Sequence, residues 1–308
     1  MRPLFRRSTA NPIITSVDMP FPASAVLNPG ATDHGDEIVL LLRVENDAGN
    51  SSIHVARSKN GVDGWVIDPE PFLDSGNSHH EYEAWGCEDP RVTYLADEEA
   101  WYITYTAYSP AGAAVAIARS EDLIRAERLG LIFSPNNKDA ALFPEKFAGR
   151  WAVLHRPDAG GGVENIWLAY SPDLIHWGEP HCVLTEGLGP AWDGARVGSG
   201  PPPILTDQGW LLLYHGVKMY GGELVYRVGV SLLDENEPHE LIARSRNCIF
   251  QAEEPYEKAG FVPNVVFPTG LLQRGNELWM YYGAADTSVC LAVADLDDVL
   301  EELENSVI

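Results

Sequence analysis

The chain is organised around short apolar segments that recur five times. The most hydrophobic kind often opens on an aromatic residue, and its copies are DEIVLLLRV from residue 36, WYITYTAYS from 101, RWAVLHRP from 150, WLLLYHGV from 210 and LWMYYGAAD from 278. Continuous apolar runs of this length, bounded by turn residues, are typical of buried β-strands. Their return at intervals of roughly 50 to 70 residues indicates a repeat architecture.

Each copy stands between two other recurring segments. A shorter strand, usually with a proline, precedes it, as in CEDPRVTYL from residue 87, and a third strand such as AVAIARSEDLI follows it. A weaker fourth strand, for example CVL at 182–184, completes each unit. We therefore predict an all-β fold, a five-bladed β-propeller, because a plain β-sandwich does not explain three motifs that recur in one order.

The two ends of the chain complete this prediction. The N-terminal segment through NPII is expected to supply the last strand of the final blade and so to close the ring. The acidic C-terminal segment DLDDVLEELENSVI is expected to form a short helix or tail. We expect residues 1–308 to form a single domain.

Polar and ionisable groups converge on one face of the predicted blades. In antiparallel blades the first strands begin and the second strands end on the same face. The polar residues at these places are Asn28, Arg43, Glu88, Asp89, Arg91, Lys138, Asp139, His155, Arg156, Arg196, His215 and Asp286. With only 21 Lys and Arg in the chain, so many cations on one face indicate a site for an anion such as phosphate. The alternative is that some of these arginines only pair with neighbouring carboxylates and hold blades together.

The same geometry assigns other residues to structural roles. Asp122 and Asp173 end third strands on the opposite face, where we expect them to form turns. Trp65 and Trp177 are expected to pack between blades rather than to bind sugar. The pair His79-His80 lacks the ligand spacing of a metal site, and no metal is predicted.

Composition narrows the class of protein. A net charge of −24 argues against nucleic acid or an anionic membrane as partner and indicates a solvated acidic surface. No apolar run is long enough to span a bilayer, and the basic N-terminus lacks the apolar core of a secretory signal. The four cysteines lie far apart, which favours reduced thiols in a cytoplasmic protein over disulfides or zinc.

An acid that faces a basic cluster suggests glycosyl transfer to phosphate or to water. Inverting cleavage requires an acid at the leaving oxygen and a nucleophile on the other face of the sugar. Phosphate as nucleophile requires no second carboxylate, but it requires basic groups that bind and orient it. Asp89, beside Glu88 and Arg91, is the best-placed acid, whereas Asp286 is better suited to bind sugar hydroxyls.

Seven motifs carry a resemblance to a known family. In order along essentially the whole chain they are YEAWGCEDPR, NKDAALFPEK, LHRP, WDGARVGSGPPPILT, GWLLLYHG, YEKAGFVPNVVFPTG and YYGAADT. Together they resemble glycoside hydrolase family 130, the mannoside phosphorylases and related β-mannosidases. The resemblance implies a five-bladed propeller that cleaves β-mannosides by inverting phosphorolysis to α-mannose 1-phosphate and an acceptor sugar. Inorganic phosphate is then the co-substrate, and no cofactor is implied.

The resemblance also implies roles for individual residues. Asp89 matches the proton donor, which is thought to act through a sugar hydroxyl. The matching positions are Lys138, Arg156, Arg196 and His215 for phosphate, Asn28, Arg43, Asp139 and Asp286 for the sugar, and Arg91 on the acceptor side. The pair Lys138-Asp139 replaces an Arg-Asn pair of several phosphorylases, and Arg196 replaces a usual lysine. These changes keep the cations but alter their geometry, because a guanidinium forks where an ammonium does not.

Four functions are compatible with the sequence. A β-mannoside phosphorylase is favoured because Arg156, Arg196 and His215 are retained. An inverting β-mannosidase would use water, with Asp139 as the nearby base, and a non-catalytic sugar-binding propeller is allowed by the fold, as is a furanosidase. The sequence leaves open the linkage (β-1,2 or β-1,4), the acceptor sugar and whether the protein is a homo-oligomer.

Overall fold

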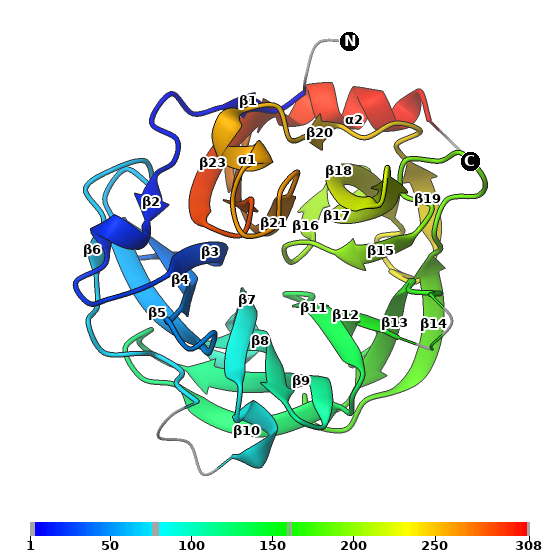
Figure 1. Cartoon of the computed structure of the whole chain (residues 1–308). Coiled ribbons are helices and arrows are strands. Elements are labelled where there is room, and N and C mark those ends of the chain that lie inside the picture. The colour runs from blue at the N-terminus through cyan, green and yellow to red at the C-terminus, as the bar shows by residue number, and fades with distance from the viewer. Residues whose placement is uncertain (1–3, 76–79, 159, 161, 307–308) are drawn as a thin grey trace.

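Five antiparallel units of β-strands form the protein in the computed structural model, which describes residues 4–75, 80–158, 160 and 162–306. The units belong to four hydrogen-bonded sheets, because the first two share one sheet through a parallel bridge between Ser51 and Gly86. Figure 1 shows the units around a common centre, in chain order from blue to red. The prediction of an all-β fold is confirmed for these residues.

The first three units contain four strands each, in chain order. The first comprises β3 (Ala25–His34), β4 (Glu37–Glu45), β5 (Ser51–Ser58) and β6 (Val66–Ile67). The second comprises β7 (Gly86–Leu95), β8 (Ala100–Ser109), β9 (Gly112–Ser120) and β10 (Glu127–Phe133). The third comprises β11 (Asn137–Leu142), β12 (Trp151–Pro157), β13 (Ile166–Ser171) and β14 (Gly178–Leu184).

The last two units depart slightly from this plan. The fourth comprises β15 (Arg196–Ser199), β17 (Gly209–Tyr220), β18 (Glu223–Leu233) and β19 (Leu241–Arg244). The short strands β16 (Ile204–Thr206) and β20 (Phe250–Gln251) pair with β17 and β18. The fifth comprises β21 (Val266–Arg274), β22 (Glu277–Ala284) and β23 (Ser288–Asp295).

The N-terminal segment completes the fifth unit. Strands β1 (Arg6–Arg7) and β2 (Ile14–Thr15) both pair antiparallel with β23, so the start of the chain supplies the outer strand of its last unit, as predicted. The predicted C-terminal helix is α2 (Leu296–Glu304), which packs beside this unit. The remaining helices are single turns: η1 (Ser16–Asp18), η2 (Glu81–Glu83), η3 (Ala96–Glu98) and α1 (Pro255–Lys258).

Apolar side chains fill the spaces between neighbouring units. Each of the five core clusters found among the described residues draws on two units, and together they link the first unit to the second and so on, with the fifth linked back to the first. Leu41 of β4 packs in the cluster shared with the second unit, whereas the adjacent Leu40 packs in the cluster shared with the fifth. Both faces of β4 are therefore buried, which explains its unbroken apolar run.

The predicted turn and core residues are confirmed. Asp122 Oδ1 accepts hydrogen bonds from the backbone N–H groups of residues 124 and 125 at 2.8 and 3.0 Å, and Asp173 Oδ1 does the same with residues 175 and 176 at 3.0 and 2.8 Å. Such local bonds stabilise the turn after each third strand. Trp65 and Trp177 pack against the clusters that join the fifth unit to the first and the second unit to the third.

Two further properties concern the predicted class of protein. No helix in the described part of the chain is both long and apolar enough to cross a bilayer. All four cysteines are free thiols, with Cys87 and Cys290 buried.

A buried ion pair fixes the N-terminal strand to the fifth unit. Arg7 donates from Nε and Nη2 to the two carboxylate oxygens of Glu257 at 2.8 and 2.9 Å. The Glu257 side chain is fully buried, and it also accepts a hydrogen bond from the hydroxyl of Tyr282 at 2.8 Å. Removal of the arginine would leave a buried charge without its counter-ion, which is far more costly than the loss of an exposed pair.

We expect Arg7→Ala to lower the free energy of unfolding by about 3 kcal/mol, measured by urea denaturation at neutral pH. Arg6→Ala is the matched control, because Arg6 belongs to the same strand but is exposed, and it should cost less than about 0.5 kcal/mol. The double variant Arg7→Ala/Glu257→Gln should recover part of the loss. Equal losses in the two single variants would contradict this role of the ion pair.

Candidate active site

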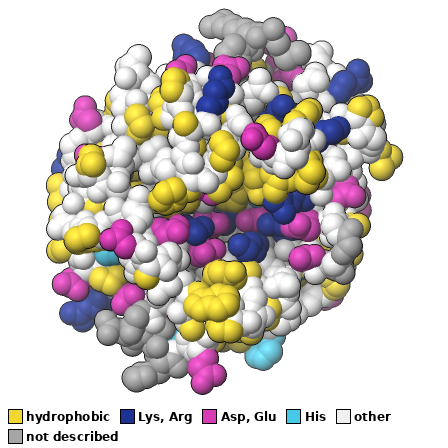
Figure 2. Space-filling view, viewed as in Figure 1, with side chains coloured by type: hydrophobic (Ala, Val, Ile, Leu, Met, Phe, Trp, Pro, Cys, Tyr) yellow, Lys and Arg dark blue, Asp and Glu magenta, His cyan; other side chains and the backbone are white. Residues whose placement is uncertain are grey.

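A cavity of about 180 Å³ lies at the centre of the five units. Figure 2 shows acidic and basic side chains gathered in a central hollow with hydrophobic side chains along its rim. Eight of the ten residues predicted for the site line this cavity: Asn28, Arg43, Asp89, Lys138, Asp139, Arg156, His215 and Asp286. A second hollow of about 430 Å³ shares Lys138, Arg156 and Tyr226 with the first and adds Arg196. Residues far apart in the sequence therefore meet as predicted, with the exception of Arg91.

Three cavity residues occupy equivalent β-bulges in successive units. Asn28 on β3, Asp89 on β7 and Asp139 on β11 each lie where the register between the first and second strands shifts, with φ of 46°, 50° and 54°. Apart from glycine, Asn and Asp adopt this left-handed conformation most readily. Bulges re-aim side chains at the ends of strands, and here they direct one polar side chain from each of three units into the cavity.

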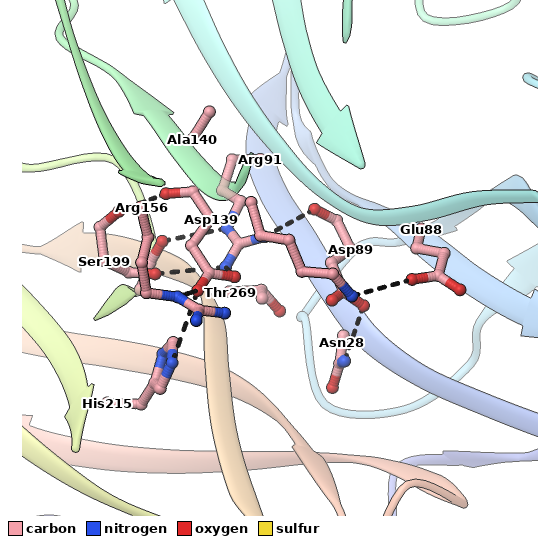
Figure 3. A network of polar contacts seen from close by, with 12 residues as sticks. Asn28, Glu88, Asp89, Arg91, Asp139, Ala140, Arg156, Ser199, His215 and Thr269 are labelled. Atoms are coloured by element: carbon pink, nitrogen blue, oxygen red, sulfur yellow. Dashed lines mark hydrogen bonds and ion pairs between the residues drawn. The ribbon is translucent and has the colours of Figure 1, made fainter. Parts of the chain in front are cut away.

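Asp89 is buried and held by two hydrogen bonds, drawn in Figure 3. Its Oδ1 accepts from Asn28 Nδ2 at 2.8 Å and from Arg43 Nη1 at 3.0 Å. Burial by itself raises the pKa of this carboxyl, but the charges of Arg43, Arg91 and Lys138 outweigh burial and hold the pKa below its ordinary value. Asp89 is thus a carboxylate near neutral pH in the unliganded protein.

Asp139 is the second buried carboxylate of the cavity. It accepts from Arg156 Nε at 2.6 Å and from Arg91 Nη2 at 3.3 Å, and it lies 3.5 Å from His215 Nε2. Burial opposes its ionisation, but the charge of Arg156 and its other neighbours lower the pKa of Asp139 well below its usual range. A Cβ atom at Gly198 would collide with both Asp139 and His215, so the close approach of β15 requires glycine there.

Arg91 does not contact the cavity, which corrects the prediction that it faces the acceptor. Its side chain is 1% exposed. Nη1 donates to the carbonyl of Asp89 at 2.8 Å, and Nε and Nη2 donate to the carbonyls of Gly200 and Ser199 at 3.2 Å each, in addition to the bond to Asp139. Arg91 is therefore a positioning residue that holds the carboxylate of Asp139 and the main chain of Asp89.

The basic wall of the cavity comprises Lys138, Arg156 and Arg196. Lys138 Nζ lies 3.6 Å from a Glu88 oxygen. Arg196 donates from Nη2 to the hydroxyl of Tyr226 at 2.6 Å and from Nη1 to Glu164 at 3.2 Å. The other Glu164 oxygen pairs with Arg156, so one carboxylate bridges two arginines.

His215 contributes to this wall without a charge. It is buried, and desolvation lowers the pKa of its imidazole to about 3; the charge of Asp139 opposes this shift, and the nearby arginines add to it. Its Nδ1 is buried and has no hydrogen-bond partner within the described structure. The sequence predicts His215 to be one of the cations, whereas in the structure it is an uncharged group near neutral pH.

Asp286 has the opposite electrostatic character from Asp89. It lies in the turn between β22 and β23 with φ 53° and lines the same cavity. Burial, followed by repulsion from the charge of Asp89, raises the pKa of Asp286 to about 6. Two carboxyl groups in one cavity thus titrate in different ranges, an arrangement found where one group must carry a proton.

Sequence reasoning missed residues at the start of the third strands. Glu164 precedes β13, and Ser51, which begins β5, accepts a hydrogen bond from Arg43 Nε at 3.0 Å. The start of a third strand lies on the same face as the end of the second strand, so the antiparallel rule itself contained this signal. No group of three or more metal-ligating side chains is found among the described residues.

The site therefore combines a polar cavity, a fixed carboxylate and an adjoining basic wall, an arrangement typical of a site for a polar or charged ligand. A family model described as beta-1,4-mannooligosaccharide phosphorylase matches residues 3–305, and the chain belongs to this family, glycoside hydrolase family 130.

Known proteins resemble the chain over most of their length. The β-1,2-mannobiose phosphorylase of Listeria innocua is 41% identical over 256 residues, which cover 82% of this chain and 69% of that protein. The β-1,4-mannooligosaccharide phosphorylase of Ruminococcus albus is 30% identical over 311 residues, 97% of this chain and 90% of that protein. A solved structure of the Listeria innocua enzyme in complex with β-1,2-mannobiose superposes with a TM-score of 0.90 at 32% identity, covering 99% of this chain and all of that chain.

We expect Asp286→Asn to stabilise the protein at pH 8 by about 2 to 3 kcal/mol and to have little effect at pH 4. A carboxyl pKa raised to about 6 means that the folded protein holds the proton more tightly than the unfolded chain does. The associated stability is present below the unfolded pKa and is lost as the pH rises through 6. Urea denaturation at both pH values measures the difference.

The exposed Asp207 provides the control, since Asp207→Asn should change stability little at either pH. A stabilisation by Asp286→Asn that is equal at pH 4 and pH 8 would contradict the electrostatic cause.

Proposed function

We propose that the protein is an inverting β-mannoside phosphorylase, which converts a β-mannoside and inorganic phosphate into α-mannose 1-phosphate and an acceptor sugar. The single observation that carries the proposal is that Asp89 and the basic residues Lys138 and Arg156 line one cavity. The names of the relatives support the same reaction, because both curated relatives are β-mannoside phosphorylases.

We also propose that residues 1–308 form one catalytic domain, a five-bladed β-propeller. The cyclic order of the five core clusters and the pairing of β1 and β2 with β23 support this architecture. A propeller gathers the inner strand of every blade at its axis, which accounts for a site drawn from all five units. The proposed location is the cytoplasm, in line with the four free cysteines.

Phosphate and the mannosyl ring are proposed to bind to different parts of the cavity. Phosphate would bind at Lys138, Arg156, Arg196 and His215, because a wall of cations and one uncharged imidazole offers donors to its oxygens. The mannosyl ring would bind against Asn28, Arg43, Asp139 and Asp286. No cofactor is needed for this reaction, since the phosphate anion itself is the nucleophile.

Asp89 is the proposed proton donor, acting through a sugar hydroxyl. In the unliganded protein its pKa lies below the ordinary value, so the substrates must raise it before it can carry a proton. Two effects act in this direction: a bound sugar removes water from the carboxylate, and a phosphate anion adds negative charge nearby. Asp286, whose pKa is already raised, would hold a neighbouring hydroxyl.

The geometry gives less support to hydrolysis. The alternative requires Asp139 to activate water, yet this carboxylate is 1% exposed and is bound by Arg91 and Arg156. A general base needs a free oxygen within hydrogen-bond reach of the water it deprotonates. We therefore retain phosphorolysis as the proposed reaction.

We expect the purified protein to release α-mannose 1-phosphate from a β-mannosyl disaccharide only in the presence of phosphate. β-1,2- and β-1,4-mannobiose should be compared, and β-1,2 is the favoured linkage because the relative with the higher identity acts on β-1,2-mannobiose. Equal cleavage in phosphate-free buffer would show hydrolysis instead. Sugar binding without turnover of either disaccharide would indicate a binding protein.

We expect Asp89→Asn to reduce kcat for phosphorolysis by about 10²- to 10⁴-fold, because an amide cannot deliver a proton. Asp122→Asn is the control, since Asp122 only stabilises a turn in the second unit. Thermal unfolding should confirm that both variants are folded. Asp89→Asn with undiminished kcat would remove Asp89 from the role of acid.

A further inference from the structure

Glu164 stands where an anion is expected to bind. Its two oxygens pair with Arg156 and Arg196, the two guanidinium groups of the basic wall. The position lines the larger hollow together with Lys138 and Tyr226. A carboxylate between two arginines resembles the contacts of a bound phosphate, because guanidinium groups recognise both anions by the same paired N–H geometry.

The charges of the basic wall are balanced in the unliganded protein. Lys138, Arg156 and Arg196 supply three positive charges, while three carboxylates contact them: Glu88, Asp139 and Glu164. His215 adds no charge near neutral pH. Glu88 and Asp139 also pair with Arg43 and Arg91, whereas Glu164 pairs only with Arg156 and Arg196 among these cations. Phosphate that binds to these two guanidinium groups therefore competes directly with Glu164.

Glu164 is the carboxylate that can move. Asp139 is fixed by a bulge on β11 and by hydrogen bonds from Arg91 and Arg156, and its side chain is 1% exposed. Glu88 lies within β7 and accepts a hydrogen bond from Arg43 at 3.1 Å. The Glu164 side chain is 15% exposed and lies outside the strands.

The backbone of Glu164 need not move for this exchange. Its carbonyl accepts a hydrogen bond from the Val197 N–H at 3.0 Å, which fixes the main chain next to Arg196 on β15. Rotation about the side-chain bonds is then sufficient to withdraw the carboxylate and free both guanidinium groups.

We propose that Glu164 is a displaceable counter-ion of the phosphate site: its carboxylate occupies Arg156 and Arg196 in the unliganded protein, and phosphate must displace it. Glu164 thereby sets the phosphate affinity and favours a doubly charged anion over weaker competitors. This inference rests on the proposed function, since it assigns phosphate to this wall.

The test compares phosphate binding to the wild type, Glu164→Gln and Glu164→Ala by titration calorimetry at pH 7.5 and low salt, without sugar. We expect both variants to bind phosphate about tenfold more tightly, equivalent to about 1.4 kcal/mol, and the gain to shrink at high salt. In turnover, KM for phosphate should fall by a similar factor. Thermal unfolding of each variant confirms that it is folded.

Glu179→Gln is the matched control. Glu179 pairs with Arg150 outside the cavity, so its substitution changes the net charge equally and should leave the phosphate affinity unchanged. A tighter affinity in this variant too would assign the effect to net charge and overturn the proposal.

The opposite role predicts the opposite result. If Glu164 is a permanent brace that orients the two arginines, Glu164→Gln and Glu164→Ala will bind phosphate more weakly or equally, and the proposal fails even though wild-type turnover depends on phosphate. If none of the proteins binds phosphate and wild-type cleavage is independent of it, the proposed function fails and this inference fails with it.

Discussion

The buried guanidinium of Arg91 is the group on which the site depends. It extends from the second unit to Asp139 of the third and to the carbonyls of Ser199 and Gly200 in the fourth, and so ties three units together at their centre. A charge this far from water is tolerated only when its donors are occupied, and each of its three nitrogens donates a hydrogen bond. The same group also holds the main chain of Asp89, so one side chain connects the packing of three units to the position of this carboxylate.

Two carboxyl groups of the cavity, Asp89 and Asp286, have pKa values that are shifted in opposite directions. Asp89 and Asp286 share one cavity, but Asp89 faces Arg43 and Arg91 whereas Asp286 faces the charge of Asp89. The result is one carboxylate and one group that titrates near pH 6. Such an arrangement costs stability, because a buried carboxylate without a close partner is unfavourable above its pKa. The proposed role of both groups in substrate binding would explain why the cost is retained.

The proposed phosphate site lies in a strongly acidic chain. Its net charge of −24 repels phosphate at long range, so binding must come from short-range contacts with the few cations of the basic wall. Three carboxylates contact that wall, and phosphate would have to compete with them for the same donors. The proposed role of Glu164 follows from this balance rather than from any single contact.

The sequence by itself determined the all-β fold, the order of the strands, the N-terminal strand of the last unit and the C-terminal helix. These depend on local patterns: apolar runs of strand length and turn residues such as Asp122 and Asp173, whose hydrogen bonds are made within their own segment. The family motifs and the antiparallel rule also predicted ten site residues, and nine of them line one of two adjoining hollows.

Only the tertiary structure decided what each side chain contacts. Arg91 lies only two residues after Asp89, which lines the cavity, yet contacts with the third and fourth units direct it into the core. The lowered pKa of His215 arises first from its burial in the packed core, and Glu164 pairs with Arg196, which lies 32 residues further along the chain on another unit. Burial and pairing between distant segments are properties of the packed ring, and no local pattern encodes them.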